Sequence, residues 1–351
     1  MQKKLLSLLL LFCLAFCTLA GCSSSDTDKE QKDPNKTETA KKSEETSKPQ
    51  TTPIDINIGC MKGPTAIGMI KLLSDSDEGT AQNHYNYTIA GTADELSAGL
   101  VNGSLDIAAV PCNLASILYN KTNGEIITAA VNTLGVLYIV EAGETIQSVK
   151  DLAGKTIYST GQGTTPEYTL RYLLTCAGLD PDKDVTIEYK SEAAEVVATL
   201  AQNPQAVAML PQPYVTVAMT KNDKLRIALD ITKEWEAQND GTVVTGVIVA
   251  RKSFIEEHKD AFANFLSEYE KSTAYANSSV EETAALLEKF DVFQAAIAKQ
   301  AIPYCNVTYL DGQEMQKNVL AYLKVLYDQN PASIGGTLPE EGMFNLEGSG
   351  S

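Results

Sequence analysis

Arginine, histidine and tryptophan are scarce in this sequence. The 351 residues include two histidines and one tryptophan, and the three arginines, Arg171, Arg226 and Arg251, lie far apart along the chain. An arginine cluster therefore does not bind the ligand of this protein, whatever that ligand is. The formal net charge is −17, and so acidic a surface repels both nucleic acid and anionic lipid. We expect no nucleic acid partner.

The sequence also lacks the spacings that mark metal and nucleotide sites. Residues 54–351 contain four cysteines: Cys60, Cys112, Cys176 and Cys305. None of them forms a Cys-x-x-Cys pair, and His84 and His258 are far apart, so we predict no metal site and no cofactor. The glycines form neither a P-loop nor a GxGxxG fingerprint, which argues against an ATPase.

No hydrophobic run is long enough to cross a membrane. Lys3 and Lys4 precede an apolar run that ends at Cys17, short of the ~20 residues that a span requires. Residues 1–21 therefore form a secretory signal peptide. The run ends in Leu-Ala-Gly-Cys, the lipobox pattern of bacterial lipoproteins, in which cleavage before Cys22 lets that residue carry acyl chains such as palmitate. An ordinary cleaved signal is the alternative.

A polar segment separates this leader from the rest of the chain. Residues 22–53 contain almost nothing apolar and mix six lysines with seven acids. Such a segment cannot bury enough surface to offset the entropy of ordering. We expect a disordered tether between a lipid anchor on the extracytoplasmic face of the cell membrane and a globular body.

The body, residues 54–351, repeats itself at an offset of about one hundred residues. GCMKGPTAIGMIKLL at 59–73 resembles STGQGTTPEYTLRYLL at 159–174, and LDIAAVPCNLASILYN at 105–120 resembles QAVAMLPQPYVTVAMT at 205–220. Each segment has a proline at the junction that leads into a helix pattern. Chance similarity between two α/β units is the alternative. The repeat predicts two lobes.

Strand and helix patterns alternate within each half. Residues 156–160 and 185–189 read as short buried strands, and Thr165 can cap a helix that Pro166 begins. This alternation predicts an α/β fold in which each lobe is a mostly parallel sheet with helices on both faces. Two extended segments suit the connections between lobes: 134–143 and 242–251.

These crossings set the expected boundaries. Lobe 1 comprises 54–141 and 244–345, lobe 2 comprises 142–243, and 346–351 form a flexible tail. In open sheets the ligand lies beyond the carboxyl ends of the strands. The cleft between the lobes is therefore the expected site.

Four repeated junctions supply the expected ligand contacts. They are Lys62, Gly63, Pro64 and Thr65; Cys112 and Asn113; Gly161, Gln162, Gly163, Thr164 and Thr165; and Gln212 and Tyr214. Each junction offers backbone N–H groups at a helix start. Glycine permits close approach, and a threonine hydroxyl adds a donor. The glycine-threonine junction has a composition suited to oxyanions.

Cys60 and Cys112 leave two further alternatives. Both are expected at the ends of strands of one lobe, so they could form a disulfide or contact the ligand. Buried free thiols are the interpretation that we favour.

Together these segments resemble a known family. The lipobox, GPTAIGM, DLAGKTI at 151–157, GQGTTPEYTLRYLL, AMLPQPY and TGVIVAR are similar to ABC-transporter substrate-binding proteins of the nitrate, sulfonate and thiamine-precursor group. The resemblance covers roughly 54–340. It implies the type II periplasmic-binding-protein fold with two crossing strands as a hinge, and it implies a monomer whose partners are a membrane permease and its ATPase.

The resemblance leaves the ligand as an organic anion or a flat heterocycle. Few basic groups are present for an anion beyond Lys62. For a heterocycle, the resemblance points to aromatic and acidic side chains: Tyr168, Tyr214, Trp235 and Glu192. Packing is the commoner role of a lone tryptophan. The alternatives to transport are an enzyme on the same fold, and a lipoprotein receptor or adhesin.

Overall fold

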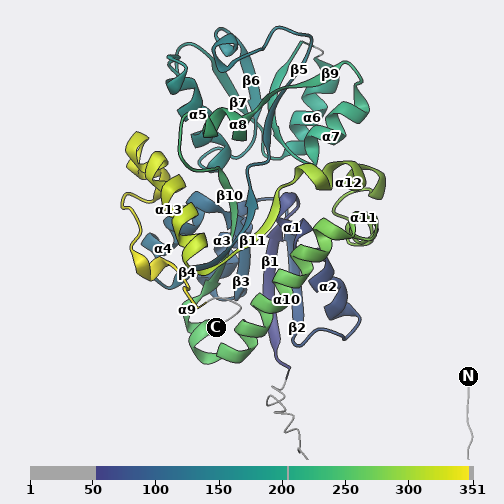
Figure 1. Cartoon of the computed structure of the whole chain (residues 1–351), viewed down its shortest axis with the longest axis vertical. Coiled ribbons are helices and arrows are strands. Elements are labelled where there is room, and N and C mark those ends of the chain that lie inside the picture. Colours follow the sequence, from purple (N-terminus) through teal and green to yellow (C-terminus); the bar gives the residue numbers. More distant parts are fainter. Residues whose placement is uncertain (1–52, 204, 348–351) are drawn as a thin grey trace, which may run out of the picture. The chain divides into compact units, whose positions relative to one another are not determined.

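The structure, a computed structural model, describes residues 53–203 and 205–347 (Figure 1). These residues form two β-sheets. The larger sheet has, in spatial order, β11 (Val307–Leu310), β4 (Ile126–Leu134), β10 (Val244–Arg251), β3 (Ile107–Pro111), β1 (Asp55–Met61) and β2 (His84–Ala90). The smaller sheet has β7 (Thr186–Tyr189), β6 (Thr156–Ser159), β8 (Val207–Pro211), β5 (Leu137–Ala142) and β9 (Leu225–Asp230). The signal peptide, Cys22, nearly all of the tether and residues 348–351 lie outside the described residues.

Helices cover both sheets (Figure 1). Those with the larger sheet are α1 (Pro64–Ile67), α2 (Ile70–Asp77), α3 (Ala93–Asn102), α4 (Cys112–Lys121), α9 (Lys252–Glu257), α10 (Lys259–Ser278), α11 (Val280–Lys289), α12 (Ala295–Ala301) and α13 (Gly312–Gln329). Those with the smaller sheet are α5 (Thr165–Cys176), α6 (Ala193–Gln202), α7 (Tyr214–Lys221) and α8 (Ile231–Glu236). Within the described part of the chain, no helix is both long and apolar enough to cross a bilayer.

Each sheet is mixed, whereas the sequence predicted mostly parallel sheets. β1 runs parallel to β2 and β3, and β6 runs parallel to β7 and β8. The strands that follow the crossings run the other way: β10 is antiparallel to β3 and β4, and β5 is antiparallel to β8 and β9. A strand that enters from the opposite lobe arrives at the carboxyl edge, so it must run against the strands that end there.

The first crossing lies earlier than the boundary predicted at residue 141. β5 pairs with β8 and β9 in the smaller sheet, so the chain leaves the larger sheet between Leu134 and Leu137. Gly135 marks this point, because a Cβ there would lie 1.9 Å from Thr232 Oγ1. The second crossing precedes β10, which begins at Val244.

The helix start predicted at Thr165 lies within one residue of the observed one. Thr164, not Thr165, is the residue before α5, and Pro166 lies in its first turn. Gly178 follows the end of this helix with φ +82°, a conformation that glycine adopts without strain. β7 is a partly exposed edge strand and not the buried strand expected.

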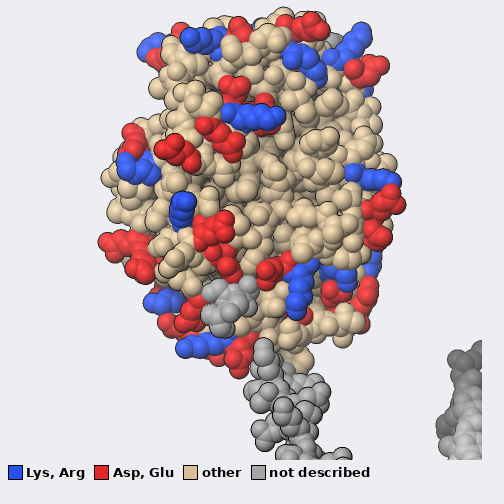
Figure 2. Space-filling model, in the orientation of Figure 1, with Lys and Arg blue, Asp and Glu red and all other residues tan. Residues whose placement is uncertain are grey.

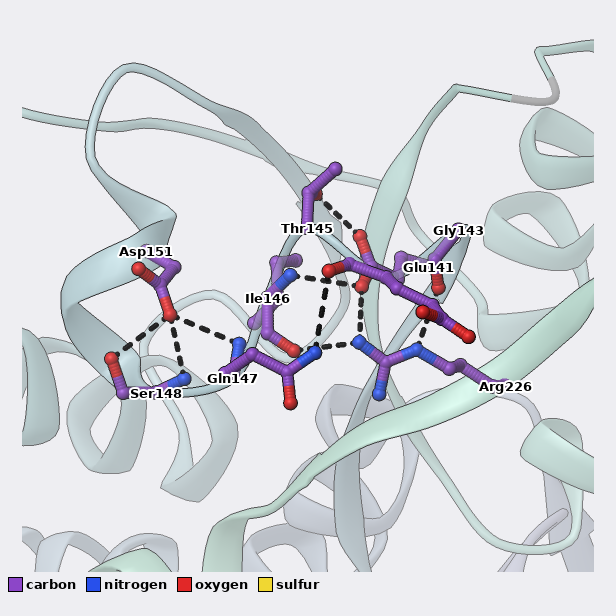
Figure 3. Close-up of polar contacts among 9 residues, drawn as sticks. Glu141, Gly143, Thr145, Ile146, Gln147, Ser148, Asp151 and Arg226 are labelled. Carbon is purple, nitrogen blue, oxygen red and sulfur yellow. Dashed lines mark hydrogen bonds and ion pairs between the residues drawn. The ribbon is translucent and has the colours of Figure 1, made fainter.

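All three arginines donate hydrogen bonds to residues of their own lobes. Arg226 donates to Glu141 at 2.6 Å and to the carbonyls of Gly143 and Ile146 (Figure 3). Arg171 donates to Glu167 and Asp182, each at 2.8 Å, and Arg251 donates to Asp106 at 3.4 Å and Ser253 at 3.0 Å. These contacts tie loops to sheets and helices, and none of the three arginines lines the cavity described next.

Candidate functional site

A cavity of about 480 Å³ lies where the strands of both sheets end. Its wall includes the junctions after β1, β2 and β3 from the larger sheet, and those after β6, β7 and β8 from the smaller sheet. Leu137 of β5 and Thr245 of β10 complete it beside the crossings. A volume of this size suits a small organic molecule.

The cavity wall contains nine of the residues expected from the sequence. They are Lys62, Gly63, Pro64, Thr65, Gly161, Gln162, Thr164, Thr165 and Tyr214. They come from opposite sheets, as the repeat predicted. Because parallel strands present their carboxyl ends at one edge, the two glycine-proline-threonine junctions face a common space.

Four other expected contacts do not line the cavity. Cys112 and Asn113 are fully buried, Gln212 is 2% exposed, and Gly163 lies beside the cavity wall without forming part of it. The first turn of a helix points its side chains in several directions, and Cys112 and Asn113 point into the protein. The prediction that these four residues contact a ligand therefore receives no support from the cavity wall.

Asn113 connects the two lobes. Its Nδ2 donates to the carbonyl of Gly163 at 3.1 Å and to that of Ser333 at 2.9 Å. Its Oδ1 accepts from Thr165 Oγ1 at 3.5 Å. Asn113 opens α4 beside the larger sheet, whereas Gly163 and Thr165 open α5 beside the smaller one, so this side chain fastens one helix start to the other.

A third pair of junctions, those after β2 and β7, also lines the cavity and was not predicted from the sequence. Thr92 and Asp94 line the cavity from one side, and Tyr189, Lys190 and Glu192 line it from the other. Of these, only Glu192 was considered, through the family resemblance. The matching helix patterns at 93–103 and 193–203 are the signal that could have identified them, because each directly follows a strand.

Two aromatic side chains proposed for a flat ligand behave differently. Tyr214 lines the cavity, and its ring meets Phe293 edge-on with centroids 5.3 Å apart. Burial, followed by the nearby charge of Glu192, raises the pKa of Tyr214, so the hydroxyl stays protonated. Trp235 is 1% exposed and packs between Tyr172 and Tyr322, which confirms the packing role.

The four cysteines that the structure describes are free thiols. Cys60, Cys112 and Cys305 are buried, and Cys176 is exposed. Cys60 and Cys112 pack in separate hydrophobic clusters, so the disulfide alternative is wrong. Burial raises the pKa of Cys60 to about 12, which leaves that thiol protonated. Residues 53–203 and 205–347 contain no group of three potential metal ligands from histidine, cysteine, aspartate and glutamate.

One protein family matches most of this body. Residues 79–301 match the family described as ABC transporter, phosphonate, periplasmic substrate-binding protein. The matched segment is more than half of the 351 residues. No curated protein sequence matches the chain.

Three solved structures share the fold. An ABC transporter from Parabacteroides distasonis is 24% identical over 85% of this chain and 100% of that one, with a TM-score of 0.70. The periplasmic aliphatic sulphonate binding protein SsuA from Escherichia coli is 17% identical over 82% and 92%, with a TM-score of 0.66. The periplasmic nitrate-binding protein NrtA from Synechocystis PCC 6803 is 14% identical over 79% and 81%, with a TM-score of 0.60. At these identities the likeness concerns the fold, and it confirms the two-lobed α/β architecture.

Proposed function

Because the chain belongs to the family of phosphonate periplasmic substrate-binding proteins of ABC transporters, we propose that it captures one small organic solute between its lobes and presents it to a permease. Members of this family are extracytoplasmic substrate-binding components of ABC importers. The protein therefore acts in solute uptake.

The observation that carries this proposal is the cavity. About 480 Å³ of space is lined by strand-to-helix junctions from both sheets, so a solute within it touches both lobes at once. A ligand that makes its full set of contacts only when the lobes are together stabilises the closed form. The permease then recognises a loaded protein by that closed shape.

Ligand contacts are assigned to the residues that line the cavity. From the β1 junction we propose Lys62, Gly63, Pro64 and Thr65, and from the other lobe Gly161, Gln162, Thr164, Thr165 and Tyr214. To these we add Tyr189, Glu192 and Thr245. The polar atoms orient the solute, and the Tyr214 ring offers a flat apolar face to it.

The anchor and the partners complete the proposal. Cys22 carries the lipid, the segment from 22 to 53 spaces the body from the membrane, and a permease with its ATPase receives the solute from a monomeric binding protein. On the face shown in Figure 2, lysines and arginines are interspersed with acidic residues and form no continuous basic patch. This agrees with a protein held at the membrane by its lipid and not by charge.

An enzyme on the same fold receives no support from the cavity. General acid-base catalysis most often uses histidine, but His84 and His258 are both exposed and neither lines the cavity. The thiol of Cys112 is buried away from the wall, and Glu192 is the other group that an enzyme could recruit there. We propose that the bound solute is released unchanged.

Native mass spectrometry of the protein purified from its own membranes tests the function. We expect one molecule of a small solute per chain, and release of that solute unchanged when the protein is unfolded. Tyr214→Ala should lower its affinity about tenfold or more, since a stacked ring contributes about 1–1.5 kcal/mol beyond its buried area. Tyr327→Ala, a tyrosine on α13 away from the cavity wall, is the control. A protein that carries and binds no solute contradicts the proposal.

A further inference from the structure

The helix starts of the smaller lobe are already occupied by side chains of the protein itself. At α5, the amide of Gly163 donates to Glu167 Oε2 at 2.7 Å. At α6, the amide of Ser191 donates to Glu195 Oε2 at 3.1 Å. Each carboxylate places a negative charge where the positive end of the helix dipole would otherwise attract an anion. A compact oxyanion would have to displace these groups or lie beside them.

The third helix start in this lobe is capped as well. At α7, the amide and the hydroxyl of Thr216 both donate to Gln212 Oε1, at 3.3 and 2.9 Å. Glu167 is held in place by Arg171, whose guanidinium also donates to Asp182. The cation nearest to α5 is therefore shared between two carboxylates and is not available to neutralise an anion in the cavity.

Hydroxyl groups on the cavity wall are likewise used inside the protein. Four lining threonines donate to acceptors of the chain itself: Thr65, Thr92, Thr164 and Thr165. Thr164 Oγ1, for example, lies 2.8 Å from the carbonyl of Gly161. Thr245 differs, because its hydroxyl oxygen is buried and has no hydrogen-bond partner among the described residues. The hydroxyl of Tyr189, another residue of the wall, is likewise buried without a hydrogen-bond partner among the described residues. Both hydroxyls are neutral donors, which bind an anion less strongly than charged donors do.

The charged side chains of the wall favour a neutral or positive solute. They are Lys62, Lys190, Asp94 and Glu192. Lys62 Nζ lies 3.9 Å from Asp291, and Lys190 Nζ lies 3.6 Å from Glu188, so each lysine has a carboxylate beside it. No ion pair joins the two carboxylates of the wall to a cation in the described part of the chain. A positively charged group on a ligand would complement the carboxylates of Asp94 and Glu192.

From these contacts we propose that the cavity selects a neutral or cationic organic solute and discriminates against compact oxyanions such as phosphonate, sulfonate and nitrate. The inference rests on the proposed function and narrows its substrate class. The amides of Gly163 and Ser191 donate to carboxylates, and the hydroxyls of four threonines of the wall donate within the protein, whereas Asp94 and Glu192 have no cationic partner among the described residues. Thr245 and Tyr189 each supply one further hydroxyl to the solute.

Calorimetric titration of the intact protein with three named probes tests the inference. After unfolding and refolding to remove any bound solute, methylphosphonate, ethanesulfonate and nitrate should each bind more weakly than about 1 mM. Tighter binding of any one of them overturns the inference. The solute recovered from the native protein is identified in parallel: a neutral or cationic molecule supports the inference, and a phosphonate, a sulfonate or nitrate overturns it.

A variant tests the physical cause. Glu167→Gln keeps an acceptor for the Gly163 amide but removes the charge. This variant should be stabilised against heat by methylphosphonate to a degree that the wild-type protein is not. Glu314→Gln is the matched control, because Glu314 lies in the first turn of α13, a helix that does not start at the cavity. An equal response of the two variants contradicts the role of the carboxylate at α5.

These outcomes separate the inference from the function on which it rests. Recovery of a phosphonate or a sulfonate leaves a working binding protein and overturns only the substrate class. A chain that carries no solute and binds none overturns the function itself.

Discussion

Asn113 shows how a single buried side chain can hold two lobes together. Its amide nitrogen donates to the carbonyls of Gly163 and Ser333, and its amide oxygen accepts from Thr165. Its hydrogen bonds to the smaller lobe are made with Gly163 and Thr165, at the start of α5. The geometry of that loop, and so of one wall of the cavity, depends on a residue of the other lobe.

Replacement of this side chain tests its role. Asn113→Ala removes the donor to the buried carbonyl of Ser333 and to the partly buried carbonyl of Gly163, so we expect the free energy of unfolding to fall by about 1–3 kcal/mol and ligand affinity to fall with it. Urea denaturation and calorimetry measure the two effects. Asn318→Ala, which removes an exposed amide on α13, should change neither. Unchanged stability of Asn113→Ala would show that the interlobe bonds contribute nothing.

The cysteines provide a second test at this scale. Cys60, Cys112 and Cys305 are buried, and burial raises the pKa of each thiol. We therefore expect iodoacetamide at neutral pH to label Cys176 among these four, and to label the other three only after denaturation. Peptide mass spectrometry reads out each site. Labelling of Cys112 in the native protein would mean that the thiol reaches the cavity.

Residue identity alone could predict only part of the site. Glycine, proline and threonine at a strand end indicated the junctions, and nine of the residues they suggested line the cavity. The sequence could not show which way the first turn of α4 faces, because that rotation is set by packing against α13 and the segment around Ser333. It also could not show that the hydroxyl groups of Thr65 and Thr165 donate hydrogen bonds to other groups of the protein.

Among the elements, the two strands after the crossings determine the architecture. β10 lies between β3 and β4, and β5 lies between β8 and β9. The chain passes between these sheets at Gly135, where any side chain would meet Thr232: a Cβ there would lie 1.9 Å from its Oγ1 and 3.0 Å from its Cβ. Absence of a side chain is what lets this connection pass α8.

We expect Gly135→Ala to destabilise the protein by about 1–3 kcal/mol through overpacking. Thr232→Ala removes Oγ1 and Cγ2, two of the three atoms that the added Cβ would meet. The variant with both substitutions should therefore recover part of the lost stability. Gly241→Ala is a suitable control, because its added Cβ would make only an ordinary contact at 3.5 Å with Ala321. Thermal denaturation compares the four proteins. A Gly135→Ala variant as stable as the control contradicts the steric explanation.

The β5–β9 pair carries a pH-dependent contact of its own. Burial alone would raise the pKa of Glu141, but hydrogen bonds from Thr145, Ile146 and Arg226 outweigh it and lower the pKa (Figure 3). A lowered folded-state pKa means that the ionised group stabilises the fold above its unfolded pKa of about 4.3. That stabilisation is lost as pH falls through the folded-state value.

Glu141→Gln isolates this contribution. At pH 7 we expect the variant to be about 1–3 kcal/mol less stable than wild type, and we expect the difference to disappear as the pH falls through the lowered pKa of Glu141. Urea titrations between pH 7 and the acid range measure it. Glu144→Gln, which changes an exposed residue just after β5, should show no such dependence. A difference that persists in acid would assign the effect to packing instead of charge.

Periodicity could predict the alternation of strands and helices, but not every break in it. The segment 59–73 predicted one helix after its proline junction, yet the structure divides that helix into α1 and α2. The break lies at Gly68, where a Cβ would come within about 3 Å of Thr273, Tyr269 and Val307. Those residues are distant in sequence, so no local signal records their approach.

For the whole molecule, the lobes share a hydrophobic core. One cluster of buried residues includes Val131 and Val247 of the larger sheet together with Ile139 and Met209 of the smaller one. Tyr322 of α13 extends this contact, since its ring lies 5.1 Å from that of Trp235 and its hydroxyl lies 2.7 Å from Thr169 Oγ1. The lobes are therefore not independent folding units.

A single unfolding transition should follow. We expect circular dichroism and the fluorescence of the only tryptophan, Trp235, to give the same midpoint in urea. Ligand at one hundred times its dissociation constant should add about 2.7 kcal/mol to the free energy of unfolding. Two separated transitions would indicate that each lobe unfolds alone.

The central place of β10 also sets an order of assembly. All strands of the smaller sheet lie between residues 137 and 230, so that half can pair its backbone as soon as this stretch has been synthesised. In the larger sheet, β3 and β4 lack the strand between them until β10, which ends at Arg251, has followed. β11 is added at the edge later still. The sheet whose first strand comes earliest in the chain is thus the sheet that is completed last.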